Sequence, residues 1–174
     1  MSDTPPLEFG FPPIADHNAR ILILGSMPSI KSLEQQQYYA HPRNAFWPIM
    51  AKTFGFEQSS SYESRCQYLI NNHIAVWDVL QSCQRQGSLD SDIVLSSMTA
   101  NDFNHFLKQH PNISQILFNG TKSEQVFNRH ALTTLTKRCA HITRQRLPST
   151  SPAHASLNFE QKLALWQQAL QIKL

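Results

Sequence analysis

Four short apolar runs divide this chain, and each is followed by a stretch with helical spacing of its apolar residues. The runs lie at residues 20–24, 74–80, 113–118 and 141–147, and the last alternates apolar with polar residues. Strands that alternate with amphipathic helices are typical of right-handed crossovers in a parallel sheet covered on both faces. We therefore predict an α/β fold, a three-layer α/β/α domain around a central four-stranded parallel sheet.

The length of 174 residues fits a single domain of this kind, which we assign to residues 19–174. Residues 1–18 contain four prolines, which block a regular helix or a central strand. We therefore expect a proline-rich N-terminal segment laid over the surface, with ordered structure beginning near Ala19.

Composition and short motifs exclude several classes of protein. The three cysteines form no CxxC pair, so neither a disulfide framework nor a zinc or iron–sulfur site is indicated. The P-loop, GxGxxG, HExxH and GxSxG motifs do not occur. No apolar stretch approaches the roughly 18 residues of a membrane span, and Asp3 and Glu8 stand where a secretory signal carries positive charge. We expect a soluble, unprocessed cytoplasmic protein.

Candidate binding segments follow the strands, because ligands bind at the carboxyl ends of strands in an open parallel sheet. Residues 25–29 (GSMPS) follow the first run, and an ordinary strand-to-helix turn is the alternative. Residues 85–92 after the second run have the composition of a turn. After the third run, a helix N-terminus and Lys122 would favour an anion, with generic capping as the alternative. Residues 147–155 after the fourth form a rigid loop between prolines, or a simple linker.

Residues 38–47 (YYAHPRNAFW) hold four aromatic side chains, a histidine, an arginine and an asparagine. The aromatic rings could stack on a flat substrate, Arg43 could face a phosphate, and Asn44 offers both a donor and an acceptor. Alternatively, Phe46 and Trp47 belong to the core and Asn44 only caps the helix that follows.

Positive charge gathers in the last third of the chain. The net charge of +3 permits an anionic partner without requiring one, but residues 121–146 hold six lysines and arginines against a single glutamate. This concentration favours a nucleic-acid backbone as partner, and a merely solvated face is the alternative.

Taken together, residues 25–29, 41–47 (HPRNAFW) and 147–155 resemble, in order and spacing, the motifs of the uracil-DNA glycosylase superfamily. Within it, the chain looks closest to the hypoxanthine-type (deoxyinosine) branch, and the mismatch-specific uracil/thymine branch comes next. The resemblance covers about residues 19–166. It implies a three-layer α/β fold with a four-stranded parallel sheet. It also implies hydrolysis of the N-glycosidic bond of a damaged base in DNA, which requires the base to leave the helical stack.

The resemblance also implies roles for individual residues. Residues 25–29 would form the floor of the base pocket, Tyr39 would stack on the flipped base, and the tip of the 147–155 loop would enter the minor groove. The implied base pocket comprises Gly25, Ser26, Met27, Pro28, Ser29, Tyr39, Asn119 and Ser149. The candidate DNA contacts, among which Arg43 and Lys122 are chosen for their charge, are His41, Arg43, Lys122, Thr150, Ser151, Pro152, Ala153 and His154.

Met27 departs from the pattern, because many relatives carry Asp or Asn in this loop to orient the attacking water. Asn44 is the best candidate for the catalytic amide, as in the hypoxanthine-type branch. An amide is a poor base, so we expect a dissociative mechanism in which an oxocarbenium-like sugar forms before water adds. No lysine nucleophile is needed, which predicts a monofunctional glycosylase without strand cleavage.

We therefore expect a monomeric enzyme that acts on double-stranded DNA containing a damaged or mismatched base, without a metal, an organic cofactor or a membrane. Hypoxanthine is the first expected base, and uracil is the main alternative. Two rival interpretations remain at this point. One is a catalytically silent DNA-binding homologue, motivated by Met27, and the other is an α/β enzyme that acts on a free nucleoside or nucleotide.

Overall fold

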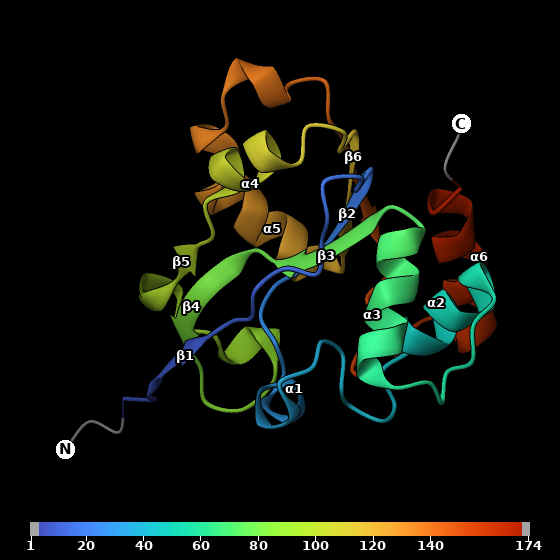
Figure 1. Cartoon of the computed structure of the whole chain (residues 1–174). Helices are drawn as coiled ribbons and strands as arrows, with labels where there is room; N and C mark the ends of the chain where they lie inside the picture. The colour runs from blue at the N-terminus through green and yellow to red at the C-terminus, as the bar shows by residue number, and fades with distance from the viewer. Residues whose placement is uncertain (1–3, 172–174) are drawn as a thin grey trace.

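The central sheet has four parallel strands in the order β3-β2-β6-β7 (Figure 1). The computed structural model describes residues 4–171, except for the side chain of Arg138; residues 1–3 and 172–174, the outer ends of the predicted segment and domain, lie outside the described part. Each predicted run supplies one strand of this sheet. The strands are β2 (Ile21–Gly25), β3 (Ile74–Asp78), β6 (Gln115–Asn119) and β7 (Thr143–Leu147). The predicted α/β class and sheet are confirmed.

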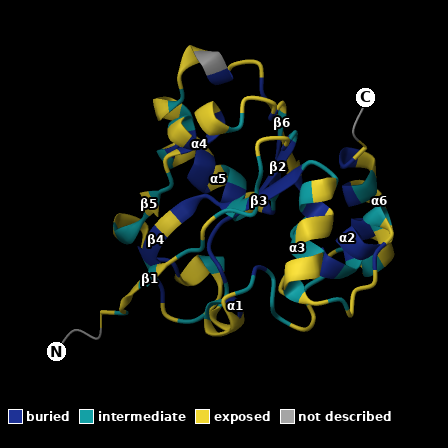
Figure 2. Cartoon of the chain, viewed as in Figure 1, coloured by how far each residue is buried: buried dark blue, intermediate teal, exposed yellow. Residues whose placement is uncertain are grey.

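Alternating side chains of β2 face two separate hydrophobic clusters, which explains the three layers. Ile21 and Ile23 pack in a cluster with residues of α2 (Phe46–Phe54), α3 (Tyr62–Asn71) and α6 (Phe159–Ala169). Leu22 and Leu24 pack in the other cluster, with residues of α4 (Phe103–Gln109) and α5 (Thr121–His130). Figure 2 shows the buried sheet between helices whose outer faces are exposed. A parallel strand buried on both faces needs such a continuous apolar run.

The second apolar run does not form one strand as predicted. β3 ends at Asp78, and β4 (Leu80–Gln84) joins a separate antiparallel sheet in the order β1-β4-β5. The backbone N–H of Val79 donates to the Gly25 carbonyl, and that of Leu80 donates to the Ser26 carbonyl. These two bonds turn the chain away from β3. An apolar run contains no local pattern that predicts such a turn.

The N-terminal segment supplies an edge strand. β1 (Leu7–Phe9) pairs antiparallel with β4, and Ile14 forms an isolated bridge with Val76. Ordered structure therefore begins before Ala19, contrary to the expectation. The prolines flank β1 on both sides, which fits an edge position because an edge strand leaves one row of N–H groups unpaired.

The starts of α6 and α5 are capped differently. Asn158 and Gln161 form a capping box at the start of α6. α5 starts from Gly120 without a side-chain cap, and the Ser123 hydroxyl donates to the Leu24 carbonyl. The remaining short elements are α1 (Ile30–Gln35), β5 (Thr99–Ala100) and four 3₁₀ turns at Asp90–Asp92, Leu95–Ser97, Leu132–Thr134 and Lys137–Cys139.

A buried ion pair fastens β1 to the end of β4. The Arg85 side chain is fully buried, and its Nη2 donates to the Glu8 carboxylate at 2.9 Å and to the Pro28 carbonyl. Removing one partner of such a pair leaves the other charge buried without compensation. We predict that Glu8→Ala lowers the free energy of unfolding by about 3 kcal/mol in urea denaturation.

Glu34→Ala is the matched control, because the Glu34–Lys31 pair spans 3.9 Å and both side chains are largely exposed. Its loss should cost about 0.5 kcal/mol or less. Equal effects of the two substitutions would contradict the structural importance of the Arg85–Glu8 pair.

Candidate active site

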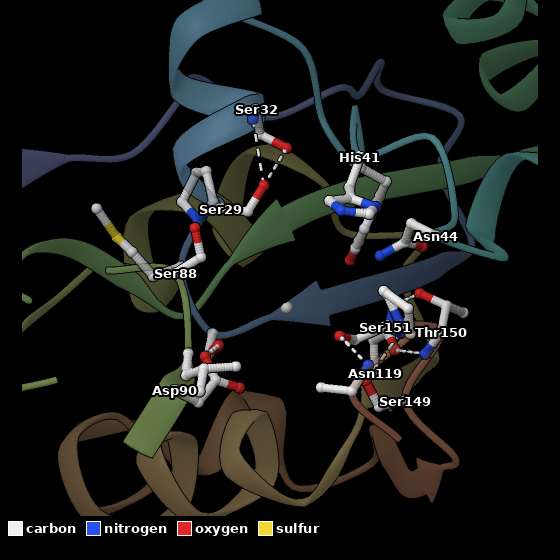
Figure 3. A pocket seen from close by; sticks show the side chains of 18 of the residues that line it. Ser29, Ser32, His41, Asn44, Ser88, Asp90, Asn119, Ser149, Thr150 and Ser151 are labelled. Atoms are coloured by element: carbon white, nitrogen blue, oxygen red, sulfur yellow. Dashed lines mark hydrogen bonds between the residues drawn. The ribbon is translucent and has the colours of Figure 1, made fainter. Parts of the chain in front are cut away.

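A cleft of about 510 Å³ opens at the carboxyl edge of the parallel sheet (Figure 3). Its walls come from four segments far apart in sequence, residues 25–32, 38–44, 88–91 and 149–154, and from two strand ends, at Asp78 and Asn119. It contains every predicted site residue except Arg43 and Lys122. The arrangement follows from the parallel sheet, which brings the residues after each strand to one edge.

The floor of the cleft depends on the absence of a side chain at Gly25. A Cβ atom built there would lie 2.4 Å from Asp78 Oδ1 and 3.1 Å from the Tyr39 hydroxyl. Both distances are below normal van der Waals contact, so the end of β3 and the 38–44 segment close over a position that only glycine fits. Ser29 completes the floor by capping α1, where its hydroxyl accepts from the Ser32 N–H.

Met27 is buried and belongs to the same hydrophobic cluster as Leu24 and Phe118. Its thioether cannot orient a water as a carboxylate or amide would. Neighbouring Ser26 donates its hydroxyl hydrogen to the Asp90 carboxylate, which ties the floor to the 88–91 segment. The floor loop is therefore held by hydrogen bonds to other segments and offers no water-orienting group at Met27.

Tyr39 adopts a left-handed backbone conformation, with φ of 54°, that turns its ring against Phe46. The two rings stack with centroids 4.1 Å apart, so Phe46 covers one face of the Tyr39 ring. Its buried hydroxyl lies near the Asn119 amide but forms no well-aligned hydrogen bond in the described chain. Burial, reinforced by the charge of Asp78, raises the pKa of Tyr39, which keeps the phenol neutral. Phe46 and Trp47 belong to the core, as the alternative interpretation had it.

Asn44 projects into the cleft between His41 and residues 149–151 (Figure 3). The side-chain Oδ1 of Asn44 accepts from the Phe46 N–H at 2.9 Å, and the backbone N–H of Asn44 donates to the His41 carbonyl. The side chain thus supports the start of α2, although the N-cap position itself is Ala45. One lone pair of Oδ1 stays available to a further donor, because an amide oxygen accepts two hydrogen bonds.

The 149–154 loop is tied to the sheet by a pair of side-chain bonds. Asn119 Nδ2 donates to the Thr150 hydroxyl, and Asn119 Oδ1 accepts from the Thr150 N–H, each at 2.9 Å. Thr150 is 1% exposed, and Asn119 has one amide hydrogen and one lone pair left for other partners. The Ser149 and Ser151 hydroxyls accept from backbone N–H groups two residues ahead, which stiffens the loop. Pro152 and Ala153 are exposed at its tip, and His154 lines the cleft beside them.

Two acids in the cleft were missed by the sequence analysis. Asp78 is 4% exposed and its Oδ2 has no hydrogen-bond partner in the described chain. Burial, reinforced by the charge of Asp90 and opposed by Arg85, raises the pKa of Asp78 to about 7. Burial also raises the pKa of Asp90, against the Ser26 hydrogen bond and the charges of Arg85 and Lys122. The sequence contained one signal for Asp78, because a carboxylate within the apolar run 74–80 is unusual, but that run was interpreted as a single strand.

The predicted phosphate contacts are spread over different surfaces. Lys122 does not line the cleft but lies close enough to Asp90 to affect its pKa. Arg43 lines a second groove that adjoins Asn44. On β7, Arg144 is exposed and Arg146 lies 3.6 Å from Glu124. The basic segment therefore does not form one continuous wall of the cleft.

Within residues 4–171, no cluster of three or more His, Cys, Asp or Glu side chains has the arrangement of a metal site. No described helix combines the length and apolar character needed to cross a membrane. The polar side chains that line the cleft are amides, hydroxyls, two carboxyls, the imidazoles of His41 and His154, and the ammonium group of Lys31.

The chain is similar to known proteins in both sequence and fold. The sequence pattern that defines the Uracil DNA glycosylase superfamily matches residues 12–171. Two proteins named hypoxanthine DNA glycosylase, from Methanosarcina barkeri and Methanosarcina acetivorans, are each 41% identical over 115 residues, which is 66% of this chain and 72% of each relative. A solution NMR structure from Methanosarcina acetivorans, described as a candidate uracil DNA glycosylase, matches with a TM-score of 0.73 and 34% identity. That match covers 96% of this chain and 100% of that one.

The buried Asp78 predicts a dependence of stability on pH. Its pKa is raised above the value of about 3.9 in an unfolded chain, so the folded state binds the proton more tightly. The contribution of the Asp78 carboxyl to the free energy of unfolding is therefore complete below about pH 4 and is lost as pH rises through 7. We predict that Asp78→Asn raises the free energy of unfolding by about 2 kcal/mol at pH 8, and that this gain shrinks towards pH 5.

Urea denaturation at the two pH values measures this difference. Asp92→Asn, an exposed carboxylate in the same region, is the control and should change stability equally at both pH values. A pH-independent effect of Asp78→Asn would show that the carboxyl titrates normally in the folded protein.

Proposed function

From the premise that this chain belongs to the Uracil DNA glycosylase superfamily and is a DNA glycosylase, we propose that it releases deaminated bases from double-stranded DNA, hypoxanthine first. The hydrolysed bond is the N-glycosidic bond, and the products are the free base and an abasic site. The preference for hypoxanthine is supported by the names of the two relatives that are 41% identical to this chain. The mismatch-specific uracil/thymine activity is the alternative substrate range.

The observation that carries the proposal is the position of Asn44 on the wall of a cleft large enough for a flipped nucleotide. The cleft volume of about 510 Å³ lies within the range of roughly 300–1,000 Å³ for small-molecule sites. Tyr39 offers one flat aromatic face, and the 149–154 loop stands at the rim with Pro152 and Ala153 exposed. A base inside the duplex cannot reach these groups, so the nucleotide must rotate out of the stack.

Asn44 is the proposed water-orienting residue. The Phe46 N–H fixes its Oδ1 at 2.9 Å, and the second lone pair of that oxygen can accept from a water held against the anomeric carbon. Met27, which is buried among apolar side chains, supplies no competing group for this task. The amide holds the water in place without deprotonating it strongly.

The proposed reaction is dissociative. The C1′–N9 bond breaks first, its electron pair leaves with the base, and the sugar becomes an oxocarbenium ion. The oriented water then adds to C1′ and loses a proton, and the departed base anion gains one, so the products are the neutral base and the abasic sugar. Most of the barrier lowering comes from preorganised groups that stabilise the departing base and the sugar cation, as electrostatic stabilisation generally does. No step forms a covalent enzyme–sugar bond, which is why strand cleavage is not expected.

Substitution of Asn44 tests this role. Asn44→Ala should reduce the single-turnover rate of base release by about 10²-fold or more, the scale of losing one preorganised group. It also removes the bond to the Phe46 N–H, so a loss of about 1 kcal/mol in folding stability is expected. Asn44→Asp keeps both acceptor functions of the oxygen and should retain most of the activity.

The assay compares otherwise identical duplexes that carry one hypoxanthine, uracil, xanthine or thymine mismatch, with alkali to reveal abasic sites. Activity of Asn44→Ala within a few-fold of wild type would eliminate the proposed role. Loss of activity in Asn44→Asp as well would assign the function to the amide hydrogens instead of the oxygen.

A further inference from the structure

A second groove, of about 440 Å³, adjoins the cleft and shares Asn44 and Thr150 with it. Its lining also includes Arg43, Lys52 and Lys162, and contains no aspartate or glutamate. These three cations come from the segment before α2, from α2 itself and from α6, so the packing of two helices and a loop brings them together. The groove is therefore cationic and lies directly beside the proposed water-orienting residue.

Lys162 is unusually buried for a lysine, at 5% exposed. Its Nζ donates to the Ser151 carbonyl at 3.3 Å, and burial lowers the pKa of its ammonium group. Lys52 Nζ lies 5.3 Å from the centre of the Phe159 ring. In the described chain, none of the three cations has a carboxylate within 4.0 Å. Arg43 and Lys52 are exposed, so the cost of a buried charge without a counter-ion applies to Lys162. An anion from outside the chain would offset that cost and pair with the two exposed cations.

We propose that this groove binds a phosphodiester of the DNA strand that carries the target nucleotide. The inference rests on the proposed function, because a nucleotide whose C1′ faces Asn44 is attached to a phosphate on each side of its sugar. The groove begins at Asn44, so it is placed to receive one of these phosphates. Arg43 and Lys52 contact the phosphate oxygens in this arrangement.

Lys162 connects this phosphate site to the loop that is proposed to enter the duplex. Lys162 lines the groove, and its ammonium group donates to the carbonyl of Ser151, next to the exposed Pro152 and Ala153. Lys162 therefore positions the loop relative to the strand. The cations of β7 are less suited to this task, because Arg146 is already close to Glu124 and neither Arg144 nor Arg146 lines a cavity with Asn44.

Binding of a hypoxanthine-containing duplex at several salt concentrations tests the groove. The double substitution Arg43→Gln/Lys52→Gln should weaken binding about tenfold or more near physiological salt. It should also reduce the slope of log Kd against log[salt] by about 1 to 2, since each lost phosphate contact removes about 0.9. Lys108→Gln, an exposed lysine on α4 outside both cavities, is the control and should leave Kd, the slope and base release unchanged.

Lys162→Met keeps the apolar stem of the side chain and removes the charge. It should weaken binding and reduce base release together, whereas the surface substitutions still test the groove if this variant does not fold. Wild-type Kd and slope in Arg43→Gln/Lys52→Gln would overturn the phosphate site. If the wild-type protein binds the duplex with groove-dependent affinity but releases no base, the proposed function fails and the groove stands. If it releases base with groove-independent affinity, only the groove proposal fails.

Discussion

The contact of three segments over Gly25 is the constraint on which the site depends. Asp78 and Tyr39 approach the position where a Cβ would stand, at 2.4 Å and 3.1 Å, so the end of β3 and the 38–44 segment can close only over a glycine. At the same place the Val79 N–H bonds to the Gly25 carbonyl and directs the chain into β4. The parallel sheet, the second sheet and the floor of the cleft therefore meet at one residue.

Asn44 connects the segments of the cleft wall, as Gly25 does those of the floor. It touches the start of α2 through Phe46 and the preceding turn through His41, and the next residue, Ala45, bonds to the Thr150 carbonyl. Thr150 in turn is held by Asn119 at the end of β6. A chain of hydrogen bonds thus fixes the amide relative to the sheet and to the 149–154 loop. Such preorganisation is what a poor base requires if its contribution is orientation.

Much of the fold could be predicted because its strands have a local signal in the amino-acid sequence. A strand buried on both faces must be apolar throughout, so the runs that became β2, β3 and β6 stand out in the sequence. The end of β3 was missed because Val79 and Leu80 are as apolar as the strand before them, and their turn depends on carbonyls of another strand. β1 was missed because its pairing with β4 depends on contacts distant in sequence.

The cleft was predicted to a similar extent and for a similar reason. Segments after strands could be found from the parallel topology, which brought 25–29, 119 and 149–154 together. Asp78 and Asp90 could not be assigned, since their significance comes from burial beside each other and from Arg85, which also binds Glu8 of the N-terminal segment. Thr150 was expected at the DNA surface, but its bonds to Asn119 place it inside.

The central claim is that a deaminated purine is released only after it has rotated out of a duplex into this cleft. The most direct measurement compares hypoxanthine release from a duplex with release from free deoxyinosine, by chromatography of the liberated base. The account predicts release from the duplex and none from the nucleoside, because the strand contacts that seat the sugar at Asn44 are missing from the nucleoside. Equal rates on both substrates would contradict it and indicate an enzyme of free nucleosides.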